Sequence, residues 1–420
     1  MKNLYLLLLL ACAFGYSQDA AVVNWIDANA IAIEGAGQDA PLSNLKQNTP
    51  AIFNDVKLFG FGEATHHTKE FFDIKARFFK YLAENNGVRV FMIEDGFGPD
   101  YNINAYIAGG GGTAKEAVSQ MGFSIWMTEE MVALVEWMRA FNANRPKTDR
   151  ITFYGIDNQF GRNINVIIKN FVAKYNVPVD QNFTAVIDSS AVLHGQRGKG
   201  NPKAKGYAKQ LADAALLLKN NFKPADAAQQ KELDATLHAF DVLQQFLKHV
   251  DGGTPKERDA AMASNAIWAL QHEGTAAKGF IWAHNEHIEN AGGAQRLGHI
   301  LKATYGSAYY SMGFDFGKGM LYSRYLNGNM SAPAIFTLEA PFKDNYAFVL
   351  SQAKADAFFI DFKLAAKDAV MDKFINSNRK NITTGATGYN PIFKGNKQDI
   401  AKAYDGLVFV RQITLPTYLK

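Results

Sequence analysis

Residues 56–85 read "VKLFGFGEATHHTKEFFDIKARFFKYLAEN" and carry the change from strand to helix on which the fold depends. The opening run is almost continuously apolar, which is typical of a strand buried on both faces. Further on, Phe71, Ile74, Phe78 and Leu82 recur at spacings of three, four and four residues and form one apolar stripe. We therefore predict a buried strand, a tight turn and an amphipathic helix.

The same alternation of strand and helix recurs along the chain. Further apolar runs bounded by Gly, Asn or Asp predict strands at residues 88–95, 151–157, 279–285, 308–316, 357–362 and 406–414. Helical patterns lie between them, among others at 131–142 and 258–273. Such an order predicts an α/β fold with a mostly parallel central sheet flanked by helices. We expect residues 18–420 to form a single large domain.

Residues 206–250 interrupt this rhythm. They are rich in Ala, Leu and Gln and show a helical pattern with no strand between its parts. We predict a helical insertion, spanning about 190–255 with its connections, that packs on the sheet domain.

The N-terminus reads as a targeting segment. Residues 1–17 contain one Lys, an apolar stretch from Leu4 to Phe14 and then small and polar residues. This pattern is typical of a secretory signal peptide, so we expect export to the periplasm or beyond the cell. Cys12 is the only cysteine, and "LLAC" (9–12) leaves lipidation at Cys12 as an alternative. No later stretch has the ~20 apolar residues that a membrane-spanning helix needs.

The composition narrows the class of partner. The 420 residues are 48% hydrophobic and 20% charged, with a formal net charge of +4. These values indicate a globular protein with a large core and give no basic surface of the kind that binds nucleic acid. The basic loop 195–206 lacks interleaved aromatic residues and reads as a solvated loop. We expect a small-molecule substrate, and the sequence does not set the oligomeric state.

Reactive side chains gather where four predicted strands end. The residues concerned are Glu63, His66 and His67; Glu94 and Asp95; Asp157, Asn158 and Gln159; and His284, Asn285, Glu286 and His287. In open α/β sheets, ligands bind beyond the carboxyl ends of the strands. The four groups are therefore predicted to share one site if their strands are neighbours.

Each of these residues also has a structural interpretation. Glu63 could cap the following helix, and Asp157 could hold a loop. Since His66 and His67 are adjacent, their side chains must point in different directions, so one of them is expected to be structural. Lys75 lies among apolar helix neighbours, and its amine either reaches the surface or points at the strand-end carboxylates.

The chemistry that remains is that of histidine and carboxylate. The chain has no Gly-x-Ser-x-Gly motif for a serine nucleophile and no His-Glu-x-x-His motif. An imidazole held by a carboxylate can take a proton from water near neutral pH. The same side chains could instead bind a divalent metal that acidifies water. A third alternative is a non-catalytic protein that binds a small molecule.

The motifs resemble those of a known family. "GEATHHTKEFFDIKARFFKYL" followed by "VRVFMIED" resembles the erythromycin esterase family, whose members share a Gly-Glu-x-Thr-His opening and a later Glu. The resemblance covers the chain from about residue 25 to its end. It continues through "EWMRAFN" (136–142), "YGID" (154–157), "RDAAMASN" (258–265), "WAHNEHI" (282–288) and "MGFDFGKG" (312–319).

The resemblance implies hydrolysis of a macrolide lactone or a similar large ester, and the sequence leaves open whether antibiotic resistance is the role. By position, His66 corresponds to the general base that activates water, without a covalent enzyme intermediate. Glu63 and Glu94 correspond to the carboxylates that organise it, and His284 and His287 to the paired histidines opposite. No cofactor is expected on this interpretation, and a divalent metal remains the alternative.

Two residues depart from the family pattern. Lys75 stands where the family usually has Arg, and a lysine is a point charge without the bidentate fork of arginine. His67 replaces a usual Gly, which narrows or recharges the pocket. Together with Asn285, these residues are the predicted substrate-binding positions, and the two departures bear on the identity of the substrate.

Overall fold

The computed structural model describes residues 18–195, 200–291, 293, 296–326, 329–384, 390 and 393–420. The predicted signal segment 1–17, with Cys12, lies outside these residues, as does part of the basic loop. The chain forms two compact units assembled from separate stretches. Unit 1 comprises Met1–Asn86, Ala283–Gly292 and Tyr305–Thr417, and unit 2 comprises Gly87–Trp282, Gly293–Thr304 and Tyr418–Lys420.

The strands of unit 1 follow the order β1-β8-β11-β6-β2, and β7 pairs with β6 beside this path. The β11–β6 and β6–β2 pairs are parallel, whereas β1–β8, β8–β11 and β6–β7 are antiparallel. The bounds are β1 Ile31–Ala32, β2 Leu58–Phe61, β6 Tyr309–Leu326, β7 Asn329–Leu338, β8 Ala357–Asp361 and β11 Gly406–Ile413. A small antiparallel pair joins β9 (Lys380–Asn381) to β10 (Asn396–Lys397).

Helix α3 (Lys69–Asn85) confirms the first predicted pattern. Its apolar stripe is buried, and the ring of Phe78 lies 5.2 Å from that of Phe61 on β2. This packing fixes the turn between β2 and α3. Further helices of unit 1 are a helix over residues 18–29, α2 Ser43–Gln47, α12 Asn285–Ile288, α14 Tyr346–Leu350, α15 Phe362–Ala365, α16 Ala369–Ile375 and α17 Ile400–Ala403.

Unit 2 contains a parallel group of strands in the order β5-β3-β4. The strands are β3 Val88–Gly96, β4 Thr152–Asp157 and β5 Lys278–Trp282. Helix α11 (Pro255–Glu273) begins with a capping box between Thr254 and Glu257 and has Pro at its first position, where a missing N–H costs nothing. Unit 2 also contains α4 Tyr101–Ile107, α5 Ala114–Val118, α6 Glu129–Ala143 and most of α13 Leu297–Tyr305.

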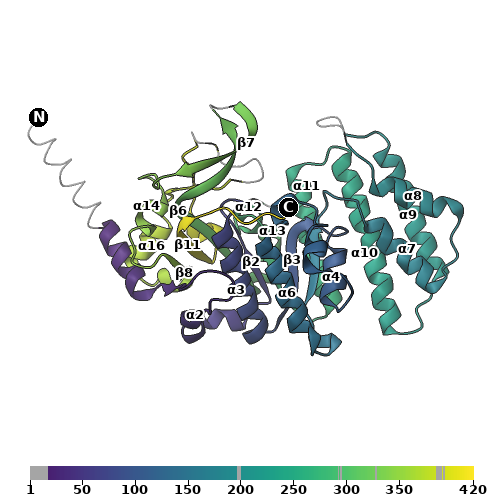
Figure 1. The fold of residues 1–420 in the computed structure, drawn as a ribbon, viewed down its shortest axis with the longest axis horizontal. Coiled ribbons are helices and arrows are strands. Elements are labelled where there is room, and N and C mark those ends of the chain that lie inside the picture. Colours follow the sequence, from purple (N-terminus) through teal and green to yellow (C-terminus); the bar gives the residue numbers. More distant parts are fainter. Residues whose placement is uncertain are drawn as a thin grey trace, which may run out of the picture. The chain divides into compact units, whose positions relative to one another are not determined.

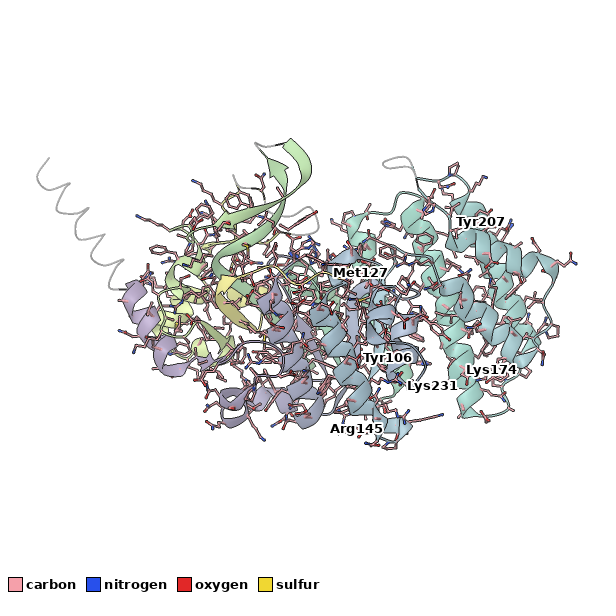
Figure 2. The ribbon with its side chains drawn as sticks, in the orientation of Figure 1. Tyr106, Met127, Arg145, Lys174, Tyr207 and Lys231 are labelled. Atoms are coloured by element: carbon pink, nitrogen blue, oxygen red, sulfur yellow. The ribbon has the colours of Figure 1, made fainter. Side chains whose placement is uncertain are left out.

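A group of helices in unit 2 corresponds to the predicted insertion (Figure 1). The predicted stretch forms α9 (Ala204–Asn221) and α10 (Ala227–Val250), which pack with α7 (Ile164–Tyr175) and α8 (Gln181–Ala191) around a shared apolar core. Charged residues lie on the outside of these helices, among them Lys174 and Lys231 (Figure 2), whose amines pair with Glu232 and Glu273.

The expected fold class, a mixed α/β fold with mostly parallel strands flanked by helices, is confirmed. The antiparallel β6–β7 hairpin was not predicted from the sequence. Among the residues that the structure describes, no helix combines the length and apolar character needed to cross a membrane.

Candidate active site

The turn between β2 and α3 holds a buried chain of three polar side chains. Glu63, His66 and Lys75 are 1%, 4% and 0% exposed. The Nδ1 atom of His66 lies 2.5 Å from Oε1 of Glu63, and the amine of Lys75 donates to Oε2 of the same carboxylate at 2.8 Å. Glu63 thus uses both of its oxygens here. The alternative in which Lys75 points at a strand-end carboxylate is confirmed.

The charge on Glu63 is stabilised by its two partners. Burial raises the pKa of this carboxyl, but the Lys75 ammonium and the hydrogen bond from His66 outweigh burial, and the net pKa is lowered. An ionised Glu63 has no proton of its own, so it accepts the hydrogen bond that the Nδ1–H group of His66 donates. The neutral imidazole then carries its lone pair on Nε2, where it can accept a proton.

His67 has an unusual backbone and a different direction from His66. Its φ of 65° places it in the left-handed region that non-glycine residues rarely adopt. Its ring packs at a tilt against that of Tyr322, with 4.3 Å between centroids and 31° between planes, and lies 6.5 Å from the His66 ring. The prediction that the two adjacent histidines point in different directions is confirmed.

The second pair of histidines flanks the start of α12. His284 is the N-cap of this helix, and its Nδ1 accepts a hydrogen bond from the backbone N–H of Glu286 at 3.3 Å. A neutral His284 therefore carries its proton on Nε2, as a donor. Its ring lies 5.1 Å from that of His66 and 6.5 Å from that of His287. The structure thus brings four of the five predicted catalytic residues together, since His66 and His287 both lie near His284 and Glu63 binds His66.

Asn285 anchors α12 to β6. Its side-chain nitrogen donates to the carbonyl of Phe314 at 2.7 Å, and its oxygen accepts from the N–H of the same residue at 3.0 Å. The side chain is 0% exposed. Gly62 is required beside it, because a Cβ at that position would lie 2.0 Å from the Asn285 oxygen. Both polar atoms of Asn285 are thus used in holding His284 and His287 in place.

Glu94 lies in unit 2 and belongs to a second charged cluster. The guanidinium of Arg258, near the start of α11, donates to Oε1 of Glu94 at 2.7 Å and also to Asp157 at the end of β4. Burial lowers the pKa of Arg258, but the two carboxylates outweigh burial and raise it. Because β3 and β4 are parallel neighbours, their carboxyl ends converge on one cation, as predicted for two of the four strand ends.

Arg258 was not among the predicted site residues. Its only signal in the sequence was its position at the head of "RDAAMASN", which reads equally well as an exposed first turn of a helix. The side chain is mostly buried, with 17% exposure.

Asp95 and Asp157 support loops. Asp95 accepts hydrogen bonds from the backbone N–H groups of Gly122 and Phe123 at 2.7 and 2.9 Å. Asp157 accepts one from the N–H of Gln159 at 3.0 Å. The structural interpretation of Asp157 as a residue that holds a loop is therefore confirmed, alongside its ion pair with Arg258.

A set of metal ligands is not found in the described part of the chain. No three His, Cys, Asp or Glu side chains are grouped there in a way that could hold an ion. His66 is hydrogen-bonded to Glu63, and His284 is hydrogen-bonded to the backbone of α12.

Comparison with known proteins places these features in a family. The family model "Erythromycin esterase" matches residues 83–413, a range that includes Glu94, Arg258, His284 and His287 and begins after His66. The YbfO protein of Bacillus subtilis (strain 168), whose given name classes it as a hydrolase, is 22% identical over 451 residues. That match covers 98% of this chain and 95% of the relative. Erythromycin esterase type II of Escherichia coli is 24% identical over 298 residues, covering 62% of this chain and 69% of the relative.

Solved structures share the fold. A crystal structure of a Bacillus cereus protein superposes with a TM-score of 0.81 at 23% identity, covering 96% of this chain and 99% of the other. A mutant of the erythromycin esterase EreC in its open conformation gives a TM-score of 0.63 at 14% identity, covering 91% and 97%. The match of the family model over most of the chain is the decisive finding, and it indicates a hydrolase. The chain belongs to the erythromycin esterase family.

Proposed function

We propose that this hydrolase opens a macrolide lactone or a similar large ester with a water molecule activated by His66. The observation that carries the proposal is the buried contact of 2.5 Å between His66 Nδ1 and a Glu63 carboxylate that Lys75 keeps ionised. This arrangement fixes the tautomer in which His66 Nε2 is a base.

The proposed reaction uses the two facing imidazoles in different roles. His66 takes a proton from water while the water oxygen attacks the acyl carbon, and the resulting imidazolium is stabilised by Glu63. His284 donates its Nε2–H to the oxyanion that develops on the carbonyl oxygen. His66 then returns the proton to the leaving alkoxide as the C–O bond breaks. The products are an acid and an alcohol, and no bond to the enzyme forms.

Two of the remaining predicted residues support this pair. We assign Lys75 and Asn285 to positioning rather than to contact with the substrate, because their polar atoms bind Glu63 and the Phe314 backbone. Glu94 lies in unit 2, where the guanidinium of Arg258 holds it, and it takes no step in the proposed reaction. The choice of a macrolide follows the name of the Escherichia coli relative.

The test is incubation of the purified protein with erythromycin and with a panel of smaller esters, followed by mass spectrometry. We expect a product heavier than erythromycin by one water. If only other esters are hydrolysed, the reaction class stands and the macrolide is wrong. If none is hydrolysed, the proposal fails.

A parallel incubation with a chelator separates this proposal from the metal-dependent alternative. Unchanged rates support activation of water by His66. A loss of rate that added Zn²⁺ or Mg²⁺ restores would favour the metal-dependent reaction instead.

A further inference from the structure

Strand β6 leaves the sheet of unit 1 at Gly319 and continues into a hairpin. Pairing with β11 ends at Gly319 and Ile413, and pairing with β7 begins at Gly319 and Leu338. Gly319 has a φ of 134°, and a Cβ there would lie 2.0 Å from the carbonyl oxygen of Ile413. Only glycine permits this path. Beyond Gly319, β6 runs to the turn between β2 and α3, where its Tyr322 contacts His67.

One face of this hairpin is apolar and partly open to solvent. Met320 and Tyr322 are two residues apart on β6, so they lie on the same face, and Ile335 on β7 is directly opposite Tyr322. Met320 is 36% exposed and Ile335 is 61% exposed, which is high for large apolar side chains. We call Met320, Tyr322 and Ile335, together with His67, the hairpin wall.

His67 connects this face to the proposed catalytic base. Its ring packs against that of Tyr322, with 4.3 Å between the centroids, and lies 6.5 Å from the ring of His66. When the attacked carbon of an ester lies beside His66, a substituent only a few carbon atoms long is enough to reach His67 and Tyr322. His67 holds this position although its backbone is in a region that disfavours a side chain.

We propose that the hairpin wall is the subsite that binds a neutral aromatic or branched apolar group of the ester substrate, and that His67 and Tyr322 determine this preference. The inference rests on the proposed function and names the class of substrate group that this chain selects. The wall offers stacking and apolar surface, which favour a flat or branched hydrocarbon group over a short or charged one.

The first test compares the ratio of kcat/KM for methyl phenylacetate to that for methyl acetate. We expect His67→Gly and Tyr322→Ala each to lower the ratio by about tenfold, the scale on which apolar pockets discriminate. Tyr322→Phe keeps the stacked ring and should keep the ratio. Asn378→Gly is the matched control, because Asn378 is an exposed residue of unit 1 with a φ of 53° and lies outside the wall.

The second test does not depend on turnover. Benzylacetone and acetone, two ketones that cannot be hydrolysed, are titrated calorimetrically into the wild type and the same variants. We expect the wild type to bind benzylacetone more tightly and His67→Gly and Tyr322→Ala to lose this preference. An unchanged preference in folded variants, in rates or in binding, would overturn the subsite. Binding of the ketone without hydrolysis of any ester would sink the proposed function and leave the subsite standing.

Discussion

At the scale of single residues, the candidate site depends on one buried carboxylate with two partners. Glu63 would resist ionisation at 1% exposure without Lys75, and without its charge the tautomer of His66 would not be fixed. The charge of Lys75 on α3 therefore acts on His66 through Glu63, because both side chains form a hydrogen bond with the same carboxylate.

Replacement of Glu63 by Gln tests this connection. The amide keeps the shape of the side chain but loses the charge that stabilises the His66 imidazolium, so we expect kcat to fall by about 10²–10⁴-fold, the range that general base catalysis supplies. Steady-state kinetics on the best ester found, with circular dichroism to verify folding, measures this. A folded Glu63→Gln protein with wild-type kcat would contradict the assignment.

Arg258 gives a second prediction at this scale, on stability. Arg258→Ala leaves the buried carboxylates of Glu94 and Asp157 without their shared cation, so we expect a loss of about 3–5 kcal/mol in the free energy of unfolding. The control is Arg145→Ala (Figure 2), whose ion pair with Asp149 is more exposed, at 36% and 40% for the two side chains, with an expected loss of about 1 kcal/mol or less. Urea denaturation measures both. Equal losses in the two variants would show that Arg258 does not neutralise the pair.

The sequence indicated that Glu63, His66 and His284 would lie close together at strand ends, but it did not indicate Arg258. Glu63, His66 and His284 stand out because polar groups directly after a buried strand are conspicuous. An arginine in the first turn of a helix is ordinarily solvated, and its burial between β3 and β4 becomes visible only when the register of the two strands is known.

At the scale of elements, the helix α12 is too short to be stable by itself, and the side chain of Asn285 holds it in place. It has four residues, fewer than an isolated helix needs, and the two hydrogen bonds between Asn285 and Phe314 fix it to β6. The histidines on either side of Asn285 are positioned by the same bonds.

Asn285→Asp is the corresponding prediction. The substitution replaces the N–H₂ donor that faces the Phe314 carbonyl with an oxygen and buries a charge, so we expect a loss of about 1–3 kcal/mol in stability. Because His284 moves with α12, we also expect a fall in kcat. Thermal denaturation and kinetics on the same preparation measure the two effects. Full activity in a destabilised variant would show that α12 need not be held for catalysis.

The elements themselves were largely predictable, with one exception. The apolar stripe of α3 and the helices of the insertion follow from periodicity alone. The β6–β7 hairpin was missed because β6 runs as far as Leu326, whereas the apolar pattern that indicated a strand stops near Phe316. What extends β6 is its pairing with β7, which local sequence does not reveal.

At the scale of the whole molecule, burial of acidic groups sets a dependence of stability on pH. Asp315 is 2% exposed, and burial raises its pKa to about 7, opposed only by a hydrogen bond from the N–H of Phe316. In the unfolded chain this carboxyl ionises near its ordinary pKa of 3.8. The folded state therefore binds a proton that the unfolded state has released, so Asp315 lowers stability as the pH rises from the ordinary pKa to about 7.

Asp315→Asn should remove this part of the pH dependence. Between about pH 5 and about pH 7 the wild type should lose up to ~3 kcal/mol more than the variant, since each pH unit contributes 1.36 kcal/mol. Denaturant unfolding of both proteins at the two pH values measures the difference, and other titrating groups cancel in the comparison. Parallel pH profiles for the two proteins would show that Asp315 is already ionised in the folded state.

The central claim is that His66 activates the water that cleaves the ester. The measurement that tests it most directly is kcat/KM of His66→Ala beside the wild type, with chelator present, on the ester that the wild type hydrolyses best. His299→Ala, a histidine of α13 outside the site, is the control. We expect His66→Ala to lose about 10²–10⁴-fold while the control keeps its rate. Equal rates in His66→Ala and the wild type would remove His66 from the mechanism and contradict this account.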